Sequence, residues 1–79
     1  MALGRIVAGN LRAVRTEQRL SQEVVAHKSG LSVSYISMLE RAERTPPLET
    51  LEALAKALKV SPLYLLQELA PGGRKARGR

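Results

Sequence analysis

The chain offers few groups suited to catalysis or metal binding. It contains a single histidine, His27, and no cysteine. A metal site needs several such ligands, and His27 has no second histidine, no thiolate and no Ser–Asp pair at an interpretable spacing. Gly4 and Gly9 are not followed by the Lys-Ser/Thr of a phosphate-binding loop. We therefore expect no catalysis, no metal, no cofactor and no small-molecule ligand.

Hydroxyl-bearing and small apolar side chains gather instead between Ser21 and Glu40. The spacing there predicts two short helices joined by a turn. Ser21 and Ser32 are residue types that cap helix N-termini, and Gly30 is the type expected just past a helix end. The outer face of the second helix has few charges, although a solvated face usually carries Lys and Glu. We therefore expect this outer face to lie against another molecule. Its residues are Val33, Ser34, Tyr35, Ser37 and Met38.

The net charge of +6 is concentrated at the two ends of the chain. Residues 1–44 carry +3, residues 45–71 carry −1, and residues 72–79 carry +4. A polyanion is the natural partner for this pattern, although an acidic membrane surface would also suit it. We expect residues 72–79 to be a disordered basic tail, either a mobile arm on nucleic acid or an inert end. Its cations are Arg74, Lys75, Arg77 and Arg79.

Length and hydrophobic spacing predict one all-α domain over residues 1–71. The chain has 79 residues and neither Phe nor Trp, so its core must be built from Leu, Val, Ile and Ala. Apolar residues recurring every three or four positions predict five helices. They cover residues 3–18, 22–28 and 33–40, a fourth that starts with Pro47 in its first turn, and a fifth over 62–70. The expected inward residues of the fourth are Leu48, Leu51, Ala55 and Leu58.

The chain carries no sign of a membrane segment. No stretch approaches the roughly 20 apolar residues that a membrane span needs. The N-terminal apolar run is short and is interrupted by Arg5, unlike a signal peptide. We expect a soluble, cytoplasmic protein.

The predicted fifth helix is more apolar than one buried face requires. Five of the seven residues from Leu63 to Leu69 are apolar. Leu65 is the best candidate for the core of the chain itself. The other apolar residues would form an exposed patch unless a second chain covered them. This favours a symmetric dimer over a monomer with one exposed apolar helix. The expected interface residues are Leu63, Tyr64, Leu66 and Leu69.

The chain resembles the Cro and lambdoid phage-repressor family of helix-turn-helix domains (the XRE type). The resemblance covers roughly residues 7–66. It rests on Leu11 with Arg15, Ser21-Gln22 with Val25-Ala26, Gly30-Leu31, Ser34-Tyr35-Ile36-Ser37 with Leu39-Glu40, and Pro46 with Leu48, Leu51, Ala55, Leu58 and Val60-Ser61. It implies a five-helix, lambda-repressor-like fold whose residues 33–40 enter the major groove of DNA. There are three departures from the family pattern. A Gly is common where Ala42 stands, an acidic residue is frequent where Leu63 stands, and the recognition helix often offers Gln, Asn, Lys or Arg where this chain has Val33, Ser34 and Met38.

The resemblance also implies roles for individual residues. Arg15 and Glu40 resemble a structural ion pair between the first helix and the recognition helix. Gln22 resembles a glutamine that meets a phosphate at a helix N-terminus. The full set of expected DNA contacts is Ser21, Gln22, Ser32, Val33, Ser34, Tyr35, Ser37, Met38, Arg41 and Arg44.

The implied function is transcriptional regulation. We expect a homodimer that binds a short palindromic operator in double-stranded DNA, as a repressor or an activator, encoded by a bacterium or a phage. Its small size is similar to that of restriction–modification controllers and phage-type repressors. Two alternatives stay open: an antitoxin-type autorepressor that binds a toxin, and a protein-interaction module whose basic tail binds RNA or lipid.

Overall fold

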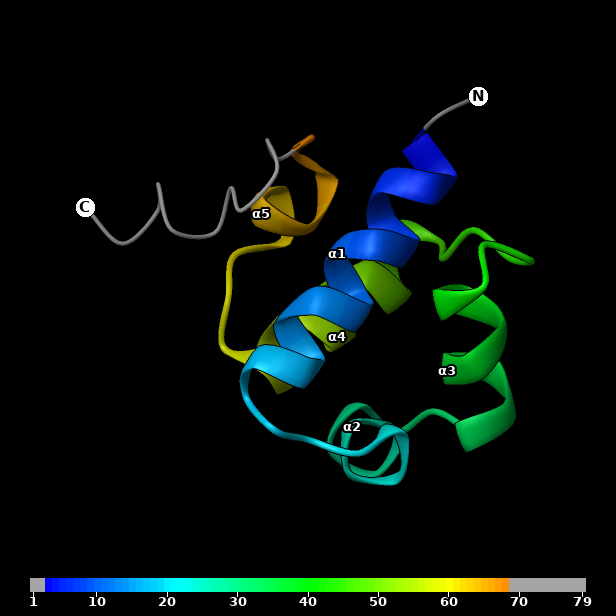
Figure 1. Ribbon diagram of the computed structural model, residues 1–79, viewed down its shortest axis with the longest axis vertical. Coiled ribbons are helices and arrows are strands. Elements are labelled where there is room, and N and C mark those ends of the chain that lie inside the picture. The colour runs from blue at the N-terminus through cyan, green and yellow to red at the C-terminus, as the bar shows by residue number, and fades with distance from the viewer. Residues whose placement is uncertain (1–2, 69–79) are drawn as a thin grey trace.

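The part of the chain that the structure describes folds into five helices, which confirms the all-α prediction. The computed structural model describes residues 3–68. Its helices are α1 (Leu3–Glu17), α2 (Gln22–Ser29), α3 (Val33–Glu40), α4 (Leu48–Leu58) and α5 (Pro62–Leu66). Helix α1 packs on α3 and α5, α2 packs on α3 and α4, and α4 packs on α5 (Figure 1). None of these helices combines the length and the hydrophobicity that crossing a bilayer requires.

Every helix contributes to one core. Helix α1 buries Val7, Leu11 and Val14, which follow the i, i+4, i+7 spacing of a single helical face. The inward residues of the other helices are Val25 and Ala26, Ile36 and Leu39, Leu51, Leu54, Ala55 and Leu58, and Tyr64 and Leu65. The helix pair α2–α3 is therefore held in place by a hydrophobic core that all five helices share, and not only by the contacts between α2 and α3.

Helix α4 departs from the prediction in its first turn. Leu48 was expected to face inward, but its side chain is 75% exposed. The buried stripe of α4 starts at Leu51, so the turn that contains Leu48 lies outside the packed face. Pro47, expected within the first turn, stands at the N-cap with extended backbone and makes no side-chain cap.

Local capping chemistry sets the starts of three helices. The hydroxyl of Ser21 accepts from the Val24 amide at 3.1 Å. The hydroxyl of Ser32 accepts from the Tyr35 amide at 3.0 Å, and Ser61 caps α5 in the same way. Each serine satisfies an amide that has no partner within its helix.

Three helices end on non-glycine residues in the left-handed region, at Arg19, Ala42 and Lys59, with φ close to +60°. After α3, the Ala42 amide donates to the Leu39 carbonyl at 3.1 Å and the Glu43 amide donates to the Met38 carbonyl at 2.9 Å. This is the Schellman arrangement, which usually has Gly at the position of Ala42. The turn after α3 therefore keeps the hydrogen bonds of the common motif but holds an alanine in a strained conformation.

Helix α5 is shorter than predicted, because it ends at Leu66 rather than at residue 70. The amide of Asn10, a buried residue of α1, donates to the carbonyls of Leu65 at 2.9 Å and Gln67 at 2.8 Å. Asn10 thus caps the end of α5 and ties it to α1. Leu69 and the basic tail, residues 72–79, lie outside the described residues.

The structure divides the apolar residues of α5 differently from the prediction. Tyr64 was expected at a dimer interface, but it is 8% exposed and belongs to the core of its own chain, together with Leu65. Leu66 is half-buried, and Leu63 is 63% exposed. Of the described residues in the predicted interface, Leu63 is therefore the one that presents most apolar surface.

Candidate nucleic-acid interface

The N-termini of α2 and α3 and the outer side of α3 form the candidate interface. Val33 and Ser34 are exposed in the first turn of α3, while Ser37 and Met38 are half-buried further along. Tyr35 is half-buried because it packs against the core. The structure thus groups the short, uncharged side chains that the sequence singled out, and Tyr35 also has a packing role.

The capping serines leave hydrogen-bonding capacity at both helix starts. Ser21 and Ser32 are exposed, and each accepts a hydrogen bond from its helix. Each hydroxyl hydrogen remains available for an acceptor such as a phosphate oxygen. The positive end of each helix dipole lies at the same place, so capping and anion binding are compatible.

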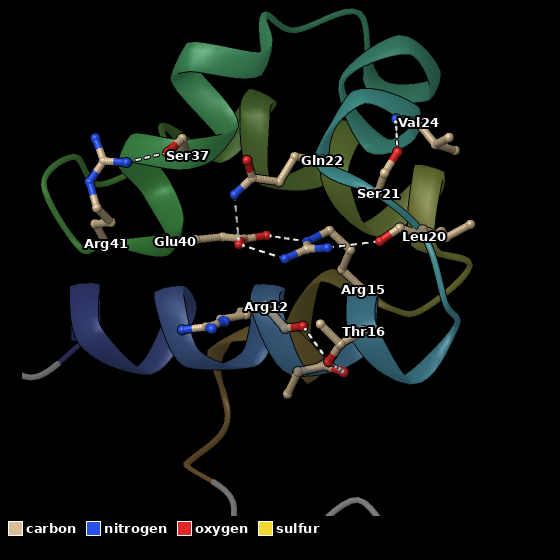
Figure 2. Close-up of polar contacts among 11 residues, drawn as sticks. Arg12, Arg15, Thr16, Leu20, Ser21, Gln22, Val24, Ser37, Glu40 and Arg41 are labelled. Carbon is tan, nitrogen blue, oxygen red and sulfur yellow. Dashed lines mark hydrogen bonds and ion pairs between the residues drawn. The ribbon is translucent and has the colours of Figure 1, made fainter.

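Arg15 and Glu40 fasten the recognition helix to α1. Arg15 Nε lies 2.6 Å from Glu40 Oε2 and Nη2 lies 3.0 Å from Oε1, a bidentate pair (Figure 2). The side chains are 13% and 4% exposed. Arg15 Nη1 also donates to the Leu20 carbonyl at 2.8 Å. The hydrogen bond with Glu40 raises the pKa of Arg15 above its ordinary value, so the guanidinium is charged under all ordinary conditions.

Gln22 joins the same cluster. Its Nε2 donates to Glu40 Oε1 at 3.0 Å, so α1, α2 and α3 meet at one carboxylate (Figure 2). Sequence reasoning placed Gln22 against a phosphate and did not foresee this hydrogen bond. Gln22 is the first residue of α2 and is partly exposed, so it lies beside the candidate interface.

Arg41 and Arg44 follow the recognition helix, and their environments differ. Arg41 Nε and Nη2 donate to the two carboxylate oxygens of Glu43 at 2.9 and 3.0 Å, and Nη1 donates to the Ser37 hydroxyl. Arg41 lowers the pKa of Glu43, chiefly through the hydrogen bond between them. Arg44 is exposed, and no ion pair of Arg44 occurs within residues 3–68. Sequence reasoning missed Glu43, whose signal was an acidic residue two positions beyond Arg41.

Comparisons with known proteins agree with this geometry. The model of a family described as helix-turn-helix matches residues 11–65. The control protein C.SmaI of Serratia marcescens is 47% identical over 66 residues, which make up 84% of this chain and 79% of that protein.

Two solved structures are similar in fold and in sequence. The restriction–modification controller C.AhdI from Aeromonas hydrophila is 38% identical, with a TM-score of 0.78 over 82% of this chain and 98% of its own. The c2 repressor of phage P22, crystallised with a synthetic operator, is 39% identical, with a TM-score of 0.73 over 77% of this chain and 92% of its own.

Proposed function

The chain belongs to the helix-turn-helix family and is a transcriptional regulator related to restriction–modification controllers and phage repressors, and from that premise we propose that it binds a short palindromic operator as a homodimer. The supporting observation is the outer side of α3. It presents Val33, Ser34 and Ser37 and is fixed from behind by the Arg15–Glu40 pair.

The short side chains of α3 suit contact with the edges of bases. The serine hydroxyls can hydrogen-bond to base edges or phosphates, and Val33 is suited to a thymine methyl group. The exposed Ser21 and Arg44 and the partly exposed Gln22 flank this side and would meet the phosphate backbone. Position and affinity would come from the flanking groups, and sequence preference from α3.

The dimer proposal is supported by the exposed apolar surface of α5. Leu63, at 63% exposure, is among the most exposed large apolar side chains of the described residues, beside the half-buried Leu66. A two-fold contact between two α5 helices would cover both leucines. It would also present two recognition helices to half-sites about 34 Å apart, one turn of DNA. Binding would then depend on protein concentration, because dimer formation and operator binding are coupled.

Selection of bound fragments from random DNA tests operator binding. We expect a palindromic consensus whose half-sites are centred about one helical turn apart. Affinity should fall steeply between about 50 and 200 mM salt, because phosphate contacts release counterions. Recovery of fragments with no shared sequence would contradict the proposal of a specific operator.

A pair of leucine substitutions tests the dimer. Leu63→Lys should shift the protein from dimer to monomer in sedimentation equilibrium and weaken operator binding, while the helical circular dichroism stays unchanged. Leu48→Lys is the matched control, because Leu48 is 75% exposed but lies on α4. It should leave the dimer intact. A wild-type mass that stays monomeric across concentrations would refute the dimer.

A further inference from the structure

Arg41 lies at the C-terminal end of α3, beside the outer side of that helix. It caps the C-terminus of α3 and lies two turns beyond Val33 and one turn beyond Ser37, on the same side of the helix. Its side chain turns back along α3 so that Nη1 reaches the Ser37 hydroxyl (Figure 2). The guanidinium therefore lies along the outer side of the recognition helix.

Glu43 and Ser37 together use three of the hydrogen-bond donors of Arg41. A guanidinium has five N–H donors. Glu43 takes one from Nε and one from Nη2, and Ser37 takes one from Nη1. One N–H remains on each of the two terminal nitrogens. Two adjacent donors on one fork match the two acceptors, O6 and N7, that guanine presents in the major groove.

The backbone fixes the position of Glu43. Its amide donates to the Met38 carbonyl at 2.9 Å, after Ala42 has turned the chain with φ of 60°. The Glu43 carboxyl is ionised at neutral pH as an ordinary glutamate is, and the hydrogen bond from Arg41 lowers its pKa further. The ionised carboxylate accepts two hydrogen bonds from Arg41, at 2.9 and 3.0 Å.

We propose that Arg41 recognises a guanine in the major groove and that Glu43 is the positioning residue that orients its guanidinium for this contact. The inference rests on the proposed function and adds the identity of one base to it. The charge of the Arg41–Glu43 pair favours a base edge over the backbone, because the carboxylate cancels the attraction of Arg41 for a phosphate and is itself repelled by one. This assignment replaces a phosphate contact for Arg41, and Arg44 keeps that role.

The test uses the full chain and the tightest-binding duplex selected from random DNA. Each G·C pair of that duplex is replaced in turn by A·T, and each guanine in turn by 7-deazaguanine, which lacks the N7 acceptor. For wild-type protein, one G·C pair in each half-site should be sensitive to both replacements. Arg41→Lys keeps the charge but loses the fork, so it should lose about 5- to 150-fold of discrimination at that pair and bind non-specific DNA with unchanged affinity.

Glu43→Gln and Arg44→Ala separate positioning from charge. Glu43→Gln frees the charge of Arg41, so non-specific affinity and the salt slope should rise while preference for the guanine falls. Arg44→Ala is the matched control and should weaken binding to all sequences alike, lowering the salt slope by about one unit. Circular dichroism checks that each variant remains folded.

Two results would overturn the inference while leaving operator binding in place. One is an Arg41→Lys variant that keeps the wild-type preference at every G·C pair. The other is an Arg41→Ala variant that behaves like Arg44→Ala, with a uniform loss and a lower salt slope. A wild-type protein that selects no sequence at all would instead refute the proposed function, and the guanine contact with it.

Discussion

Removal of the Arg15 side chain should destabilise the protein more than any change to its surface charges. Arg15→Ala leaves the Glu40 carboxylate, 4% exposed, with the neutral amide of Gln22 as its partner among the described residues. An uncompensated charge at such a site costs about 3 kcal/mol. Glu40→Ala should cost less, about 2 kcal/mol, because Arg15 keeps the Leu20 carbonyl and its long side chain can turn toward water.

Urea unfolding followed by circular dichroism at pH 7 measures these losses. A domain of this size has a free energy of unfolding of roughly 4–12 kcal/mol. With a slope of about 1 kcal/mol per molar urea, a loss of about 3 kcal/mol moves the midpoint by about 3 M. The double variant Arg15→Ala/Glu40→Ala should lose less than the two single losses combined, with a coupling of about 1–3 kcal/mol.

The exposed pair Arg41–Glu43 provides the control for this experiment. Its side chains are 55% and 53% exposed, so solvent and salt screen their attraction. Removing either one should leave the urea midpoint unchanged within error. The reasoning about Arg15 fails if the single losses simply add in the double variant, or if Arg15→Ala shifts the midpoint no more than Arg41→Ala does.

Three further predictions concern positions that the sequence did not single out for stability or pH dependence. Ala42→Gly should raise the free energy of unfolding by about 1 kcal/mol because it relieves a left-handed alanine, whereas Gly30→Ala should lower it by a similar amount. A Cβ at Gly30 meets nothing within 4 Å, so the loss there would come from backbone conformation and not from a clash. Urea midpoints equal to that of the wild type would contradict both predictions. Asn10→Leu keeps the side-chain volume but leaves the end of α5 uncapped, and should cost about 2 kcal/mol in the same assay; an unchanged midpoint would show that water satisfies those carbonyls. The carboxyl of Glu43 should titrate by NMR below its ordinary pKa, and Arg41→Ala should return it to the ordinary value; because the folded pKa is the lower one, any stabilisation by the pair is present above the unfolded pKa and is lost as pH falls through the folded pKa.

The parts of the fold that sequence reasoning located are those set by local chemistry. A serine before an apolar run predicts a helix start, since its hydroxyl satisfies a free amide within three residues, as at Ser21, Ser32 and Ser61. The spacing of Val7, Leu11 and Val14 predicts a buried face for the same reason, because helical geometry alone brings them together. Neither inference needs knowledge of the rest of the chain.

The features that were missed depend on contacts between distant segments. Leu48 fits the inward stripe of its helix by spacing, but its side chain is 75% exposed and the buried residues of α4 begin at Leu51. The early end of α5 depends on Asn10, more than fifty residues earlier in the chain. A single asparagine within an amphipathic helix gives no signal of the carbonyls that it will meet. The Arg41–Glu43 pair is local by contrast, and it spans a left-handed turn at Ala42 that an alanine disfavours.

Gln22 shows how the scaffold and the reading surface can share one side chain. Its amide nitrogen has two hydrogens, and one of them is donated to Glu40 Oε1. The second hydrogen is left for a phosphate, so the predicted DNA contact does not require the hydrogen bond to Glu40 to break. Binding of a phosphate would instead connect the DNA backbone, through Gln22 and Glu40, to Arg15 and the core-facing helix α1. Loss of Glu40 should therefore weaken operator binding even where the variant remains folded, because it removes the anchor that orients Gln22.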